Sequence, residues 1–265
     1  MKRGGAAEET NEEFWRDYLT QPDSFLRVGR RVFTHLPSEP RCRMCTAPFA
    51  GPGGPLMRLI GKRPSQANPY MCTSCQDTMI RHHGGAEVDG AMLFADIRGS
   101  TALAEGMSTA EFHGLLNHFY STASQVVFEH EGTVDNFVGD ELVAHFFPSF
   151  AGEHYVSKAV EAAQAVLRET GHADSGGPWV RVGAGVNAGR AWFGAVGEGT
   201  HVELTAVGDV VNTAARLASA AGAGEVQVSA DAAAAAGLDA GLERRSLKLK
   251  GKSESTEVVV LGASA

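Results

Sequence analysis

The sequence lacks any apolar run long enough to cross a membrane, and its polar start, Met1–Gly5, has no apolar core of a signal peptide. Positive charge is scarce as well: 23 Lys and Arg stand against 31 Asp and Glu, which gives a net charge of -8. That balance argues against a protein that coats nucleic acid. We therefore expect a cytoplasmic protein that has neither a membrane nor a nucleic acid as its partner.

Cysteine is rare, but the four cysteines form two pairs, Cys42-x-x-Cys45 and Cys72-x-x-Cys75. Two such pairs can present four thiolates tetrahedrally to zinc. The surrounding segment, residues 37–85, is rich in proline and glycine, which disfavours long helices and strands, so it needs another source of order. We predict a zinc site; an iron–sulfur cluster and metal-free reduced thiols are the alternatives.

Charge and composition divide the chain near Gly84-Gly85. Residues 27–83 carry a net charge of +7, whereas residues 84–265 carry -12. The excess arginine in the first of these regions is consistent with an anion site or with solvated charge alone. We expect three segments: a helical arm over 1–36, the cysteine segment over 37–85, and a larger regular domain over 86–262.

The larger domain alternates between strand and helix patterns. Ser108 and Glu111 form a capping box that opens a long amphipathic helix, and Gly139-Asp140 reads as the turn of a hairpin. Strands are expected near 88–97, 133–138, 141–147, 179–187, 190–196 and 201–206, and helices near 100–105, 108–131, 152–170 and 209–220. The order β-α-β-β-α-β predicts an α+β fold of the ferredoxin-like split βαβ type, with helices packed on an antiparallel-rich sheet.

Two acidic residues stand in strand-like surroundings. Asp96 directly follows the apolar run Met92–Ala95, and Asp140 lies in the hairpin turn. In a split βαβ sheet these positions are neighbours, so the two carboxylates repel each other unless cations neutralise them. The pair predicts a two-metal site for Mg²⁺ or Mn²⁺, with two ordinary turn aspartates as the alternative.

A short helix is predicted to follow Asp96. Arg98-Gly99-Ser100-Thr101 combines a glycine turn with hydroxyls suited to a helix start, where free amides can hold phosphate. Farther along, Asn212 and Arg216 lie four apart on one helix face, which places an amide one turn from a guanidinium. Such a pair can orient a sugar oxygen and stabilise phosphate charge.

Three motifs together resemble those of the class III nucleotidyl cyclases, the adenylate and guanylate cyclases. A fourth motif lies near the C-terminus, and the resemblance spans about residues 88–262. The motifs are Phe94–Thr101, Phe137–Asp140, Val207–Arg216 and Leu249–Lys252. The cysteine segment resembles, more weakly, an N-terminal extension of some bacterial members.

The resemblance implies a homodimer with active sites at its interface. One protomer would bind two metals through Asp96, Asp140 and the carbonyl of Ile97. The partner would contribute Asn212 for the ribose and Arg216 for charge on the phosphorus. Lys250 would touch the terminal phosphates, and Arg98, Gly99, Ser100 and Thr101 would also contact substrate.

The base-reading positions depart from the usual pattern. Asn136 stands where adenylate cyclases typically have lysine and guanylate cyclases glutamate, and Thr205 stands at the partner position, as in many bacterial adenylate cyclases. Because asparagine both donates and accepts, it excludes no base. We expect ATP as substrate, with GTP, CTP and UTP open. A nucleotide sensor without turnover and an adaptor built on the cysteine segment are the alternative functions.

Overall fold

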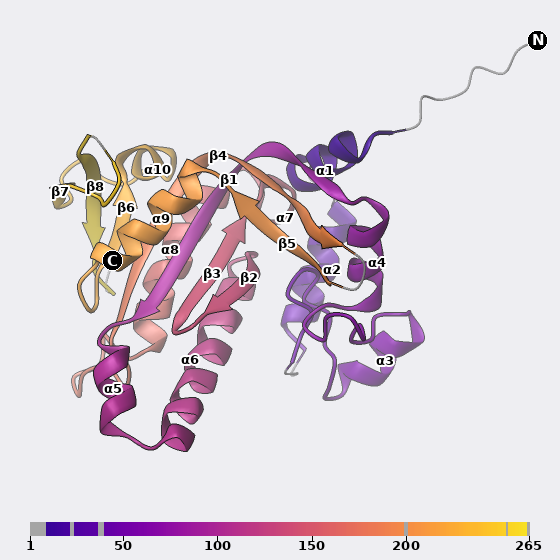
Figure 1. Cartoon of the computed structure of the whole chain (residues 1–265), viewed down its shortest axis with the longest axis horizontal. Coiled ribbons are helices and arrows are strands. Elements are labelled where there is room, and N and C mark those ends of the chain that lie inside the picture. Colours follow the sequence, from indigo (N-terminus) through magenta and orange to yellow (C-terminus); the bar gives the residue numbers. More distant parts are fainter. Residues whose placement is uncertain (1–8, 22–23, 37–39, 199–200, 253, 264–265) are drawn as a thin grey trace, which may run out of the picture.

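The computed structural model describes residues 9–21, 24–36, 40–198, 201–252 and 254–263. Figure 1 shows two regions: an N-terminal lobe drawn in indigo and purple, and a larger sheet domain that carries the C-terminus. The N-terminal lobe contains four helices among the described residues. They are α1 (Asn11–Thr20), α2 (Ser24–Thr34), α3 (Gly53–Leu59) and α4 (Thr73–Arg81).

Two of these helices have side-chain caps that explain where they begin. Thr10 and Glu13 form a capping box at α1, and the Cys72 sulfur accepts the Cys75 amide at the start of α4. Between α2 and α4 the chain forms mostly turns, in keeping with its proline and glycine content.

The sheet domain is built on one eight-stranded sheet, whose path runs β2-β3-β1-β4-β6-β8-β7 with β5 paired to β4. All pairings are antiparallel except β4 with β6. The strands are β1 (Gly84–Ile97), β2 (Thr133–Val138), β3 (Glu141–Phe146), β4 (Val182–Glu198), β5 (His201–Val207), β6 (Val226–Ser229), β7 (Arg244–Leu247) and β8 (Thr256–Leu261). The predicted α+β fold with an antiparallel-rich sheet is confirmed.

Six helices accompany the sheet in the described chain. Ser108 and Glu111 cap α6 as predicted, and α9 has the predicted bounds. The helices are α5 (Ser100–Gly106), α6 (Thr109–Glu129), α7 (Pro148–Ala151), α8 (Tyr155–Glu169), α9 (Asp209–Ala220) and α10 (Ala230–Ala235).

One prediction was wrong: residues 182–198 form a single strand, not two. The expected break near residue 188 does not occur because β1 pairs with β4 without interruption, from Gly84 with Ala195 to Ile97 with Val182. Pairing across so long a strand satisfies the backbone groups that a break would have exposed.

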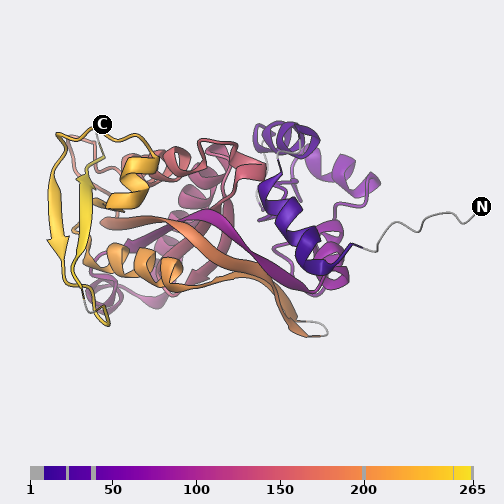
Figure 2. The same ribbon diagram turned by 90° about the horizontal axis from the view of Figure 1, so that it is seen from above.

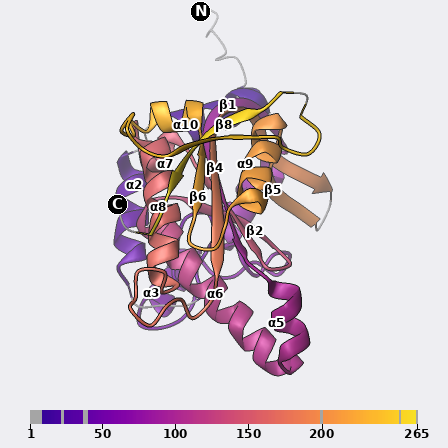
Figure 3. The ribbon, with the colours of Figure 1, turned by 90° about the vertical axis from the view of Figure 1, so that its left-hand side faces the viewer.

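Each face of the sheet has its own hydrophobic core. On one face, α6, α8 and α10 cover alternate residues of β1, among them Leu93 and Ala95. On the other face, Met92 and Phe94 pack with α9 and with the N-terminal lobe, including Trp15 and the cysteine segment. Seen end-on, α8 and α9 lie on opposite sides of the strands (Figure 3). From above, the lobe adjoins the end of the sheet where β1 begins (Figure 2).

No helix in the described residues is both long and apolar enough to span a membrane.

Candidate active site and cysteine cluster

The structure brings the two predicted metal-binding acids together at one end of β1. Asp96 is paired with Glu141, the residue that follows Asp140, and the amide of Ile97 donates to the Asp140 carbonyl over 3.3 Å. The antiparallel pairing of β1 with β3 therefore places the β2–β3 turn beside the end of β1. Both carboxylates are half-buried at this point.

Arg98 lies among these acids and joins them to α9. Its guanidinium forms an ion pair with Asp96, and Nη1 donates to the carbonyl of Ser219 over 3.1 Å, near the C-terminal end of α9. Burial lowers the pKa of Arg98, while the charges of Asp140 and Glu141 raise it. In this arrangement Arg98 acts as a counter-charge to the acids.

Glu141 is a third acid at this position. Burial raises its pKa to about 7, the charge of Arg98 lowers it, and the charge of Asp140 raises it further. Three carboxyl groups, those of Asp96, Asp140 and Glu141, thus gather at the end of β1, as expected of a site that accommodates cations.

Gly99 makes the turn from β1 into α5. Its φ is 73°, a left-handed conformation that favours glycine, and its carbonyl accepts the amide of Leu103 over 3.1 Å. Ser100 and Thr101 form the first turn of α5. The four predicted substrate contacts, Arg98 to Thr101, thus lie directly beyond the acids.

A basic groove of 510 Å³ lies beside α9. Among the described residues, it is lined by three cations, Arg216 from α9 with Lys248 and Lys250 from the loop after β7, and by no acidic residue. An ion pair between Lys252 and Asp209 ties this loop to the start of α9. The groove has the charge of a polyphosphate site.

Asn212 lies one turn before Arg216 on α9 and is exposed. It does not line the groove, and no hydrogen bond among the described residues joins it, or Arg216, to Asp96 or Asp140. Arg98 connects the acids to the C-terminal end of α9 through its hydrogen bond to Ser219, a residue that also lines the groove.

The two base-reading residues are placed differently. Asn136 lines a cavity of 90 Å³ together with Asp135 and Glu203. Thr205 lies two residues after Glu203 on β5, where it pairs with Gly194, but it does not line the cavity.

Asp135 is the extra residue of a bulge in β2, where the register with β3 shifts between Val134 and Asn136. Burial raises its pKa to about 7, aided by the charge of Glu203 and opposed by Arg43. His145 lies nearby on β3, with Nε2 3.7 Å from the Asp135 carboxylate, and burial lowers its pKa to about 4. His145 is therefore neutral at pH 7, so the two side chains form no ion pair there.

Replacing Asp135 with asparagine should change the pH dependence of stability. The pKa of Asp135 rises from 3.8 to about 7 on folding. Its contribution to the free energy of unfolding is therefore present below pH 4 and is lost as pH rises to 7. The loss should reach about 2–4 kcal/mol at pH 8.

Chemical denaturation of wild type and Asp135→Asn from pH 4 to 8 measures this effect. The variant should gain stability relative to wild type as pH rises, because it has no carboxylate to ionise. Asp89→Asn, at an exposed position of β1, is the control, and its stability should depend on pH in the same way as that of wild type. A constant difference between Asp135→Asn and wild type across this range would contradict the prediction.

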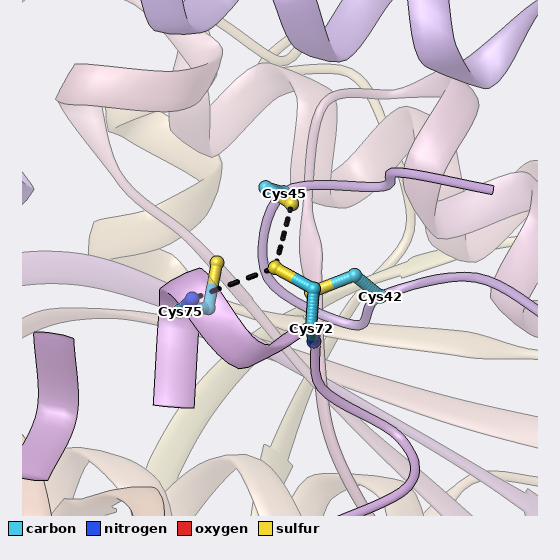
Figure 4. A group of neighbouring side chains, drawn as sticks. All are labelled: Cys42, Cys45, Cys72 and Cys75. Carbon is cyan, nitrogen blue, oxygen red and sulfur yellow. Dashed lines mark hydrogen bonds between the residues drawn. The ribbon is translucent and has the colours of Figure 1, made fainter. Parts of the chain in front are cut away.

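The four cysteines converge in the N-terminal lobe (Figure 4). All are buried and free of disulfides, and their sulfur atoms all lie within 4.8 Å of one another. The Cys45 and Cys72 sulfurs are 3.7 Å apart. A tetrahedral ion with Zn–S bonds of about 2.3 Å separates its sulfurs by about 3.8 Å, so the spacing fits zinc.

Nearby donors favour a thiolate at Cys45. The Lys62 ammonium lies 3.7 Å from the Cys45 sulfur, and hydrogen bonds from Cys42, Cys72 and Cys75 hold the pKa of Cys45 well below its ordinary value. Burial raises the pKa of Cys42 well above its ordinary value, and hydrogen bonds within the cluster raise that of Cys75. The Cys72 amide donates to the Cys42 sulfur over 3.3 Å. Four converging sulfurs with such donors fit the chemistry of a metal-binding set.

Sequence reasoning did not find several residues at these sites. Lys248 could have been predicted from the sequence, because Leu247–Lys250 alternates apolar and basic residues. In an extended chain this alternation places Lys248 and Lys250 on the same side. Asp135, Glu203 and Arg43 had none, since they meet only through tertiary packing.

Residues 86–262 match the family described as the adenylate and guanylate cyclase catalytic domain. The match covers well over half of the chain, which therefore belongs to this family. The recognition of a class III nucleotidyl cyclase domain is confirmed.

Two curated relatives illustrate the similarity. Adenylate cyclase 1 of Rhizobium meliloti (strain 1021) is 32% identical over 144 residues, which cover 51% of this chain and 22% of that protein. The adenylate cyclase of Anabaena cylindrica is 30% identical over 133 residues, covering 48% and 26% respectively. This chain thus spans about a quarter of the length of these relatives.

Solved structures of cyclases have a similar fold. The guanylyl cyclase Cya2 superposes with a TM-score of 0.59 at 25% identity, covering 67% of this chain and 93% of that one. The adenylyl cyclase CyaB from P. aeruginosa gives 0.58 at 28% identity, covering 67% and 95%.

Proposed function

We propose that this chain converts a nucleoside triphosphate, ATP by preference, to its 3′,5′-cyclic nucleotide and pyrophosphate at the interface of a homodimer. The observation that carries the proposal is the pair of half-sites: crowded acids at the end of β1, and a basic groove beside α9. Neither half suffices alone for a metal-assisted phosphoryl transfer.

Asp96, Asp140 and the carbonyl of Ile97 would hold two Mg²⁺ or Mn²⁺ ions. Their oxygen donors suit these hard cations, and the clustering of Asp96, Asp140 and Glu141 at the end of β1 supports a cation site there. When bound, the cations would lower the pKa of the substrate 3′-hydroxyl and neutralise the α-phosphate.

The chain's own residues would position the substrate. Arg216 would stabilise the charge that develops on the α-phosphate, and Asn212 would orient the ribose. The 3′-oxygen forms a bond to the α-phosphorus while the bond between the α-phosphorus and the oxygen that bridges to the β-phosphate breaks. The proton of the 3′-hydroxyl passes to water. Lys250, aided by Lys248, would bind the leaving pyrophosphate.

A homodimer would join the acids of one protomer to the α9 residues of its partner. A two-fold axis that brings the acids of one protomer to α9 of its partner creates two equivalent sites. Relatives named adenylate cyclases support ATP as the preferred substrate, and the Asn136 amide can donate to a ring nitrogen of adenine.

The cysteine cluster would hold one structural zinc ion, and the segments 1–36, 37–85 and 86–262 would serve as arm, metal-binding segment and catalytic domain. We place the protein in the cytoplasm, where reduced thiols are maintained.

Turnover assays with each of the four nucleoside triphosphates test the proposed function. Purified protein with Mn²⁺ should release pyrophosphate and a 3′,5′-cyclic product, fastest from ATP, as measured by chromatography. Asp140→Asn is the matched inactive control. Failure to cyclise any of the four would overturn the enzymatic function; tight ATP binding without turnover would then indicate a nucleotide sensor.

A further inference from the structure

The cavity beside Asn136 is formed jointly by the sheet domain and the N-terminal lobe. Thr133 to Asn136 of β2 and Glu203 with Leu204 of β5 form one side. Arg43, Asn68 and Tyr70 of the cysteine segment, with two methionines, form the other. The lobe is therefore part of this wall.

Arg43 links the cysteine cluster to β2. It directly follows Cys42, and its Nη1 donates to the carbonyl of Asp135 over 3.2 Å. Its guanidinium contacts two rings, 4.0 Å from the centre of Tyr70 and 4.7 Å from that of Phe137. These contacts hold the guanidinium in place and anchor the bulge immediately before Asn136.

The polar groups in the cavity have a defined character. The side-chain Oδ1 of Asn136 accepts a hydrogen bond from the Phe137 amide over 2.8 Å, so its NH₂ group is the part of the side chain that can donate to a ligand. Asp135 and Glu203 contribute carboxylates, which accept hydrogen bonds. The cavity therefore places two carboxylate acceptors beside donors from the Asn136 amide, Arg43 and Asn68.

Its size suits the edge of a heterocycle. Because a water occupies about 30 Å³ in the liquid, 90 Å³ corresponds to about three waters. The cavity can therefore take the edge of a nucleobase that bears its exocyclic group.

We infer that the N-terminal lobe forms part of the nucleobase site and that Arg43 fixes the position of Asp135 and Asn136 there. The site then selects bases that bear an exocyclic amino group over uracil. The inference rests on the proposed function in taking Asn136 as a base-reading residue. Arg43 acts through the two residues it positions, and Asn68 closes the cavity from the same lobe.

Binding without turnover separates this inference from the proposed function. The probes are the 3′-deoxy forms of ATP, GTP, CTP and UTP, which lack the attacking hydroxyl, and inorganic tripolyphosphate. Dissociation constants are measured by calorimetry with Mn²⁺ on the full chain. In wild type, 3′-deoxy-UTP should bind at least about tenfold more weakly than the best of the other three, since a hydrogen bond to a charged group is worth about 1.5–3 kcal/mol.

Arg43→Gln should remove most of this preference while leaving tripolyphosphate affinity and zinc content unchanged. Arg58→Gln, an exposed arginine of α3 in the same lobe, should keep the preference. If Arg43→Gln loses zinc, Asn68→Ala and Glu203→Gln decide, and each should weaken the preference. The inference is overturned if wild type shows no base preference, or if the variants that retain zinc keep the wild-type ratio.

Discussion

A mixture of Asp96→Ala and Arg216→Ala proteins should show cyclase activity that neither variant has alone. In the proposed dimer each site takes its acids from one protomer and its α9 residues from the other. A heterodimer of the two variants then contains one intact site and one doubly defective site. Random mixing gives heterodimers for about half of the dimers, so about a quarter of wild-type activity should return.

Each single variant should be at least about 10²–10³-fold less active than wild type, because each removes charge stabilisation from the transition state. Asp96→Ala mixed with Asp140→Ala is the matched control, since both substitutions fall in the same half-site and no intact site can form. Two affinity tags purified in sequence verify the heterodimers. Verified heterodimers without recovered activity would refute the shared site.

The acids and the α9 pair were predictable because their spacing follows local geometry. A strand followed by a helix and a hairpin places Asp96 beside the turn that contains Asp140, whatever surrounds them. Asn212 and Arg216 depend only on the helical repeat. These positions needed no knowledge of long-range packing.

The docking of the N-terminal lobe was not predictable in this way. The unbroken apolar run Ala91–Ala95 indicates a strand buried on both faces. It does not tell which segment covers the second face. That face is completed by Trp15 and Met44, which are distant in sequence from β1. Arg43 reaches Asp135 only because of this packing.

The same packing makes the cysteine cluster important for the whole fold, so Cys72→Ser should both lose zinc and lower the melting temperature. Cys72 is fully buried and belongs to the core that includes Phe94 and Phe193 of the sheet. Losing one ligand removes much of the metal's contribution to folding, several kcal/mol. At about 2–4 °C per kcal/mol for a domain of this size, the melting temperature should fall by roughly 10 °C.

Metal analysis of wild type should give about one zinc per chain, and Cys72→Ser should retain little. The matched control is Ser74→Ala, an exposed position in the first turns of the same helix, which should keep both zinc and stability. Because β1 contributes to both cores, the wild-type lobe and sheet domain should melt together in one calorimetric transition. Equal melting temperatures for Cys72→Ser and Ser74→Ala would show that the cysteine cluster does not stabilise the sheet domain. A second transition in Cys72→Ser at the wild-type temperature would show that the lobe and the sheet domain unfold independently.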